Sequence, residues 1–264
     1  MNYRGRLAPT PTGYLHLGHA RTFWIAQQRA QAAGGTLLYR NENLDAARCK
    51  PKYTKAAMED CRWIGLNWEG DVTHQSDRLD IYRKAFEQLK QSGHLFPCTC
   101  TRRDLEKAVT APHAESGETI YPGTCREKTT IPETKYNWRF RVPDGEHITF
   151  LDENYGPQLF VAGRDFGDFP VWQKNGIPSY QLAVVVDDAA QEITEVVRGA
   201  DLLVSTARQL LLYRALKLVS PAFYHCDLML DAEGNRLAKR NRALSLRELR
   251  VNGKSPEELR KEWI

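Results

Sequence analysis

Residues 6–21 read RLAPTPTGYLHLGHAR, and the order of residue types in this stretch decides the fold. A short strand is expected over residues 3–8, because the turn-rich residues 9–13 follow it directly. A helical pattern then runs from about residue 18 to residue 33 and stops at two glycines. Strand, loop and helix in this order predict the opening of an α/β fold.

His16 and His19 stand where the loop passes into this helix. A helix amino terminus attracts phosphate through its unpaired N–H groups and its dipole. Side chains three residues apart lie on one helical face, so both imidazoles are expected to donate hydrogen bonds to one phosphate group. Gly18 between them leaves room for a flat base to approach the backbone. The alternative is a pair of surface histidines beside a helix start, and the same H-x-G-H string also serves nucleotidyltransferases.

Outward from this stretch, strand and helix patterns alternate. A second strand is expected at 36–42, and glycines close the two helices that follow it. The continuous apolar run at 181–186 is interpreted as a buried parallel strand. These patterns predict a parallel sheet with helices on its faces. The other expected elements are helices at 51–65, 77–93 and 206–218, strands at 195–198 and 225–230, an alternating run at 138–142, and one or two short helices after residue 234.

The composition and the pattern of the chain change at Pro97. Residues 97–180 hold most of the prolines and three of the six cysteines, which predicts an inserted, irregular subdomain. Strand and helix patterns return after it, and the chain is basic after residue 234. We therefore expect four segments, namely the first half of the main domain at 1–96, the insert at 97–180, the second half of the main domain at 181–233, and a basic tail at 234–264.

The composition is that of a folded protein. With 264 residues and 42% hydrophobic content, the chain suits one large domain with an insert, at roughly 100–200 residues per domain. Its net charge of +4 is only weak support for a polyanionic partner. The six cysteines show no secreted disulfide framework, and no apolar run approaches the ~18 residues of a membrane span. Because no apolar signal core is present at the amino terminus, we expect a reducing cytoplasm and no membrane partner.

Four ordered parts of the chain resemble the glutamyl-tRNA synthetases, a family of class I aminoacyl-tRNA synthetases. Departures from the family pattern occur at Asn43, Leu44 and Ala238. The resemblance implies an α/β fold with a Rossmann-type parallel sheet, an inserted zinc-bearing subdomain and a short helical C-terminal tail. The matching parts are residues 6–21, residues 40–45 (RNENLD), the pair 179–188 and 193–203 (SYQLAVVVDD, ITEVVRGADLL), and residues 236–240 (RLAKR).

The resemblance implies activation of L-glutamate by ATP, with Mg²⁺, to give glutamyl-adenylate and pyrophosphate. This transfer depends mostly on positioning and on stabilisation of charge. The expected catalytic residues are His16 and His19, which stabilise charge at the α-phosphate, and Lys239, which meets the departing phosphates as a point charge. The expected ATP-binding residues are His16, Gly18, His19, Arg236, Leu237 and Lys239.

A glutamate substrate brings two carboxylates and an ammonium group. Planar guanidinium groups suit carboxylates, a glutamate suits the ammonium, and a tyrosine hydroxyl adds a hydrogen bond. For each residue alone, a structural salt bridge or a capped strand end is the competing interpretation, and which arginine binds which carboxylate stays open. The resemblance places around the amino acid Arg6, Ala8, Thr10, Glu42, Tyr180 and Arg198.

Three cysteines cluster in the insert, Cys98, Cys100 and Cys125. Zinc prefers four ligands in a tetrahedron, with thiolates among them. His113 is a candidate fourth ligand on ligand chemistry alone. Tyr121 is favoured by resemblance, because C-T-C-T…Y-x-G-x-C is similar to the zinc element of the glutamyl-Q tRNA(Asp) synthetases, a truncated branch related to the glutamyl-tRNA synthetases. Three unbound thiols in a loop are the competing interpretation.

The same branch lacks the large helical anticodon-binding region of the glutamyl-tRNA synthetases. Only about two dozen residues follow Arg240, so we expect this chain to share the truncation. The resemblance then implies transfer of glutamate to the queuosine base in the anticodon loop of tRNA(Asp), and single-stranded loops suit recognition by a small domain. Arg240, Arg242, Arg247 and Arg250 are expected either to contact phosphate or to form a solvated face.

Three other functions stay open. The first is a truncated synthetase that charges tRNA(Glu). The second is an H-x-G-H nucleotidyltransferase with a small phosphorylated acceptor, against which Arg6 and Glu42 argue. The third is a zinc-stabilised RNA-binding module without catalysis, against which His16, His19 and Lys239 argue.

Overall fold

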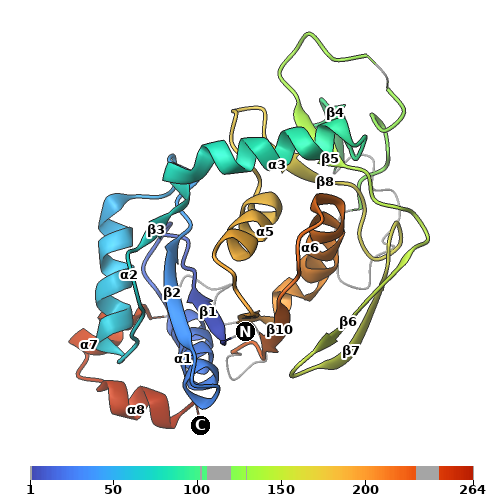
Figure 1. Ribbon diagram of the computed structural model, residues 1–264. Helices are drawn as coiled ribbons and strands as arrows, with labels where there is room; N and C mark the ends of the chain where they lie inside the picture. The colour runs from blue at the N-terminus through green and yellow to red at the C-terminus, as the bar shows by residue number, and fades with distance from the viewer. Residues whose placement is uncertain (1, 102, 106–119, 129, 230–243, 264) are drawn as a thin grey trace. The chain divides into compact units, whose positions relative to one another are not determined.

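The computed structural model describes residues 2–101, 103–105, 120–128, 130–229 and 244–263 (Figure 1). The chain divides into two compact units. The first unit comprises residues 1–77, 192–201 and 221–264, and the second comprises residues 78–191 and 202–220. The four segments expected from the sequence stay a prediction.

Parallel strands form the centre of the first unit. Pairs of neighbouring strands run in parallel register, with Leu7 opposite Tyr39 and His225 opposite Arg198. The strand that carries Arg4 also lies beside residue 194, because Thr194 N–H donates to the Arg4 carbonyl over 2.9 Å. This confirms the predicted α/β fold with a parallel sheet. One sheet has the order β3 (Thr73–His74), β2 (Thr36–Asn41), β1 (Arg4–Leu7), and the paired strands β9 (Glu195–Gly199) and β10 (Ala222–Cys226) follow, with β9 in contact with β1.

Helices cover the sheet of this unit. Gly34 and Gly65 follow the first two helices with φ of 59° and 83°, the left-handed backbone that favours glycine and ends a helix. The last two helices each begin with a capping box, Ser245 with Glu248 and Ser255 with Glu258. The helices are α1 (Leu17–Ala32), α2 (Pro51–Trp63), α7 (Leu246–Val251) and α8 (Pro256–Lys261), with short 3₁₀ turns at Gln75–Arg78 and Ala200–Leu202.

One hydrophobic core holds the first unit together. Apolar side chains of the two strands β1 and β2 meet those of the covering helices, and α7 and α8 pack onto the same core through Leu246, Leu249 and Leu259. The two short helices expected after residue 234 are therefore confirmed as α7 and α8, and they are integral to this unit.

The second unit combines helices with antiparallel strands. A three-stranded sheet has the order β4-β5-β8, and β6 and β7 pair as an antiparallel hairpin. No helix among the described residues is long and apolar enough to cross a membrane. The elements are α3 (Leu79–Gln91), β4 (Leu95–Cys98), β5 (Asn137–Phe140), β6 (His147–Asp152), β7 (Gly156–Val161), β8 (Phe169–Trp172), α5 (Tyr180–Ala190) and α6 (Leu203–Leu216).

Two predicted strands are corrected by the structure. Residues 181–186 lie in helix α5, and the expected buried strand is wrong. Residues 182–188 are all buried, so the helix shows no polar face, and a continuous apolar run does not distinguish a buried helix from a buried strand. The last strand, expected at 225–230, is β10 at Ala222–Cys226, because its pairing with β9 starts at Ala222 opposite Glu195.

Candidate active site and cysteine cluster

The carboxyl ends of β1, β2 and β9 gather the first group of candidate residues. In open parallel sheets, ligands bind outside this edge, where loops lead from strands into helices. The loop from Ala8 to His16 leaves β1 at this edge, and Glu42 follows β2 directly. The Glu42 N–H donates to the Pro9 carbonyl over 3.0 Å, which holds the two strand ends together.

His16 is the N-cap residue of α1, and His19 lies in the first turn. The N-cap side chain makes no capping hydrogen bond, and no acidic residue occupies the first turn, so the positive end of the helix dipole has no built-in anion. The two imidazole rings lie with their centroids 3.8 Å apart. A methyl group at Gly18 would make an ordinary contact of 3.4 Å with the His16 ring.

Both histidines are held in the neutral form. Burial lowers the pKa of His16 below its ordinary value. Desolvation by the surrounding protein, and then the charge of His16, lower the pKa of His19 to about 4, although the His19 side chain keeps an exposed face. At pH 7 each ring therefore offers one N–H donor and no charge.

Arg6 and Glu42 lie buried at the same edge. The Arg6 Nη1 atom donates to the Val197 carbonyl of β9 over 2.9 Å, so this side chain crosses from β1 to β9. The Glu42 carboxylate accepts a hydrogen bond from Arg40 Nη2 over 3.1 Å, and Arg40 is fully buried. A carboxylate has two oxygens and accepts several donors, so the Arg40 pair is compatible with a substrate ammonium.

Arg198 lies on β9, next to the residue that Arg6 contacts. Its Nε atom donates to Nε2 of His225 on β10 over 3.2 Å, and its guanidinium lies 5.6 Å from the Phe223 ring centre. His225 is fully buried and stands directly opposite Arg198 in the parallel register. A histidine that accepts at Nε2 carries its proton on Nδ1, so it is neutral in this arrangement.

The three clustered cysteines belong to the second unit. Their sulfur atoms all lie within 4.8 Å of one another, which is close enough for one metal ion. The Tyr121 hydroxyl lies 3.3 Å from the Cys98 sulfur and 3.7 Å from the Cys100 sulfur, and Cys100 and Cys125 are 3.7 Å apart. For zinc with Zn–S bonds of about 2.3 Å, tetrahedral geometry gives S···S distances of about 3.8 Å. The Cys100–Cys125 distance matches this spacing, and all four donor atoms lie close enough together for one zinc ion.

The surroundings favour a thiolate at Cys125, whereas burial raises the pKa of Cys100 to about 11 and raises the pKa of Tyr121. Arg139 Nε donates to the Cys98 sulfur over 3.2 Å, and its guanidinium lies 4.1 Å from the Tyr121 ring centre. Burial opposes charge on Cys125, but hydrogen bonds from the Thr99 backbone, Tyr121 and Cys100 outweigh it and lower the pKa of Cys125 to about 6. Metal ligands must be deprotonated, so this environment suits a cation.

Residues 2–262 match the family of class I tRNA synthetases for glutamate and glutamine (E and Q), through their catalytic domain. The chain belongs to this family. Nearly all of the synthetase chain, including the cysteine cluster, lies inside the matched region.

Individual relatives differ in how far the match extends along them. A glutamyl-Q tRNA(Asp) synthetase of Symbiobacterium thermophilum is 47% identical, over 96% of this chain and 83% of the relative. A glutamate–tRNA ligase of Aquifex aeolicus is 38% identical, over 96% of this chain and 55% of the relative. The solved glutamate tRNA ligase of Elizabethkingia meningosepticum, in complex with its amino acid, has a TM-score of 0.78 at 28% identity, over 96% of this chain and 54% of the other. This synthetase chain thus spans about half the length of the two glutamate ligases.

The structure brings some of the predicted site residues of the synthetase together. The residues that share the strand edge of the first unit are Arg6, Ala8, Thr10, His16, Gly18, His19, Glu42 and Arg198. Tyr180 begins α5 in the second unit, with 39% of its surface exposed. Arg236, Leu237 and Lys239, the alternative zinc ligand His113, and Arg240 and Arg242 lie outside the described residues. Arg247, on α7, contacts Glu59 and Asp60 of α2.

Sequence reasoning missed two residues that hold the site. Arg40 stands two residues before Glu42, and alternation along a strand places both on one face, so the R-x-E spacing itself was a usable signal. His225 carried no comparable signal, because its contact with Arg198 depends on the register of β9 and β10.

Proposed function

We propose that this chain activates L-glutamate with ATP and transfers the glutamyl group to the queuosine base in the anticodon loop of tRNA(Asp). The observation that carries glutamate activation is the pair of buried guanidinium groups, Arg6 and Arg198, on the neighbouring strands β1 and β9. They stand at the edge of the sheet from which the His16–His19 pair begins helix α1. Two cationic forks suit a substrate with two carboxylates, and a helix start with two N–H donors suits phosphate.

In the proposed reaction, the glutamate α-carboxylate attacks the α-phosphate of ATP and pyrophosphate leaves. His16 and His19 donate hydrogen bonds to the α-phosphate and stabilise the charge that develops there. Glu42 pairs with the substrate ammonium, while Arg40 holds the Glu42 carboxylate in place. Magnesium accompanies the ATP phosphates.

The position of the described residues from 244 onward supports the proposed role of the lysine loop. Ser245 pairs with His16, and the Leu246 N–H donates to the Leu15 carbonyl over 2.8 Å. The chain that follows residues 236–240 is therefore fixed beside the two histidines. This supports the proposal that Lys239 meets the departing pyrophosphate.

The acceptor is supported by the comparison with relatives. The glutamyl-Q tRNA(Asp) synthetase of Symbiobacterium thermophilum shares more identity with this chain than the Aquifex aeolicus glutamate–tRNA ligase does, 47% against 38%. The cysteine set agrees with that choice. A zinc ion held by Cys98, Cys100, Tyr121 and Cys125 would stabilise the loops of the second unit, and the reducing cytoplasm that we expect would keep the thiols available.

Glutamate-dependent exchange of pyrophosphate into ATP tests the activation step, with aspartate and glutamine as controls. Exchange with glutamate alone and without tRNA is the expected result, and silence with and without tRNA would refute the activity. Transfer of labelled glutamate to queuosine-containing tRNA(Asp), but not to unmodified tRNA(Asp), tests the acceptor. Labelling of tRNA(Glu) instead would favour the second candidate, a synthetase for tRNA(Glu), which the similarity to glutamate–tRNA ligases supports.

A further inference from the structure

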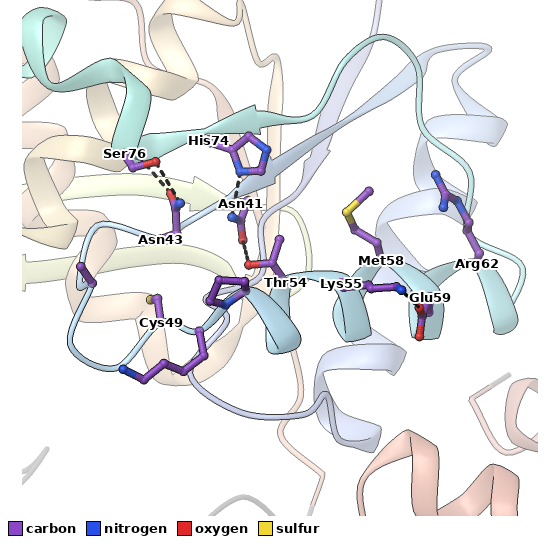
Figure 2. A pocket seen from close by; sticks show the side chains of 13 residues that line it. Asn41, Asn43, Cys49, Thr54, Lys55, Met58, Glu59, Arg62, His74 and Ser76 are labelled. Carbon is purple, nitrogen blue, oxygen red and sulfur yellow. Dashed lines mark hydrogen bonds and ion pairs between the residues drawn. The ribbon is translucent and has the colours of Figure 1, made fainter.

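A pocket of about 560 Å³ lies in the first unit, between α2 and the carboxyl ends of β2 and β3 (Figure 2). Its volume is in the range of small-ligand sites, about 300–1,000 Å³. Asn41, on β2, faces this pocket, while the next residue, Glu42, makes its ion pair with Arg40. Neighbouring residues of a strand point to opposite faces. The pocket is therefore separate from the candidate glutamate site, although the two share one strand end.

The inner end of the pocket is a fixed chain of hydrogen bonds. The Thr54 hydroxyl donates to the Asn41 amide oxygen over 3.5 Å, and the Asn41 amide nitrogen lies 2.9 Å from His74 Nδ1 (Figure 2). Because the Asn41 NH₂ group is a donor, His74 Nδ1 accepts and a ring proton stands on Nε2. Asn41 is buried. His74 thus holds an N–H donor at the pocket end, suited to a carbonyl or phosphate oxygen.

The length of the pocket follows helix α2. Figure 2 shows Thr54, Met58 and Arg62 in succession along the helix, leading away from Asn41. Three cations, Lys50, Lys55 and Arg62, line the pocket against one carboxylate, Glu59. Glu59 is already contacted by Lys55 at 3.9 Å and by Arg247 of α7. The pocket wall therefore has a net positive charge.

The spacing of these cations indicates the size of the ligand. Arg62 stands twelve positions after Lys50, the N-cap residue of α2, which is about 18 Å at 1.5 Å per residue. One phosphate group does not span that length, whereas a positive groove of this kind follows the backbone of single-stranded nucleic acid. Met58 between the cations offers an apolar, polarizable surface to a base. The donor of His74 suits a base carbonyl or a phosphate oxygen at the inner end.

We propose that this pocket binds a single-stranded segment of RNA, with its phosphates along Lys50, Lys55 and Arg62 and one nucleotide against His74. The inference rests on the proposed function in one respect, since the RNA is then the loop of the acceptor tRNA. The loop from Glu42 to Lys50 joins the two sites, and the Lys50 N–H donates to the Pro11 carbonyl in the loop that follows β1. Bound RNA would therefore lie beside the activated amino acid.

Direct binding tests this proposal without any need for catalysis. The probe is the fluorescently labelled anticodon stem-loop of tRNA(Asp), titrated with the full-length protein over a range of salt concentrations. Lys50→Ala and His74→Ala are expected to weaken binding about tenfold each. Lys50→Ala is also expected to reduce the slope of log K against log salt by about 0.7, the value for one lost phosphate contact in a single strand.

Lys261→Ala is the matched control, because Lys261 is exposed on α8 of the same unit and does not line the pocket. Glutamate-dependent pyrophosphate exchange by Lys50→Ala is expected to equal that of the unmodified protein. Equal affinity and equal salt slope for Lys50→Ala, His74→Ala and Lys261→Ala would overturn the proposal. Binding of inorganic phosphate or AMP in the pocket, without binding of the stem-loop there, would also overturn it. If the protein showed no exchange activity but lost RNA binding in the two pocket variants, the proposed function would fail and the pocket assignment would stand.

Discussion

His16 and His19 lie face to face at the start of α1, with ring centroids 3.8 Å apart and ring planes 33° from parallel. At this separation two imidazolium ions would repel each other, and burial already disfavours either charge. The pair therefore acts through two neutral N–H donors added to the free backbone N–H groups of the helix start. Such donors are aligned before the reaction, so they stabilise developing charge without reorganisation.

Removal of one donor is expected to slow glutamate activation strongly. We predict that His19→Ala lowers kcat for pyrophosphate exchange about 10²- to 10³-fold, the usual effect of deleting one preorganised donor. His19→Asn keeps an N–H donor and should recover part of the rate. Both variants should melt within a few degrees of the unmodified protein, because the His19 side chain keeps an exposed face. Exchange rates within twofold of normal in His19→Ala would contradict the assigned role.

The same pKa shift makes the stability of the protein depend on pH. The pKa of His19 is about 4 in the folded protein and 6.5 ordinarily. Between these values the unfolded chain binds more protons, so the free energy of unfolding decreases as the pH falls from about 6.5 towards 4. The lowered pKa of His16 acts in the same direction. Thermal melts across this range should fall more steeply for the unmodified protein than for His19→Asn, and identical pH profiles would show that His19 does not titrate in this way.

Local sequence patterns were sufficient to predict the helices whose ends are marked by a glycine. Gly34 and Gly65 end α1 and α2, and both helices were predicted to within a few residues. Helix α5 was not, because burial on all sides removes the polar face by which a helix is recognised. The candidate site residues show the same difference between local and long-range signals. Arg6 and Glu42 stand in contiguous motifs, whereas the contact of Arg198 with His225 joins two strands whose register no local pattern specifies.

The contact between Arg198 and His225 gives a test of substrate positioning. His225→Phe keeps a buried ring but removes the acceptor for Arg198 Nε, so the guanidinium loses its fixed orientation. We predict about a tenfold rise in KM for glutamate in pyrophosphate exchange, with a smaller change in kcat and in KM for ATP. His225→Gln retains an acceptor and should recover part of the affinity.

Tyr224→Phe is the control for this experiment, because Tyr224 is the neighbouring residue of β10 and its ring packs against Arg29 at 4.1 Å. A phenylalanine keeps that packing, so the kinetic constants should not change. A uniform fall in kcat for His225→Phe with an unchanged KM for glutamate would argue against positioning. It would point to a general disturbance of β9 and β10.

The cysteine cluster is expected to hold one zinc ion per chain. Cys98, Cys125 and Tyr121 are buried together, and Cys100 packs against them, so four donor atoms suited to zinc lie side by side. We predict that Cys125→Ser lowers the zinc content well below one ion per chain and lowers the melting temperature. Elemental mass spectrometry measures the zinc content. Chelation of the unmodified protein should have the same thermal effect, because a structural ion contributes directly to folding.

Tyr121→Phe identifies the fourth ligand. If the phenolate binds zinc, this variant should hold the ion more weakly in competition with a chromophoric chelator, while Cys49→Ser, a buried cysteine of the first unit, should be unaffected. Tyr121→Phe with normal zinc affinity would exclude the phenolate. His113→Ala would then decide whether the histidine takes its place. Absence of zinc from the unmodified protein, purified without chelators, would favour unbound thiols and would refute the metal site altogether.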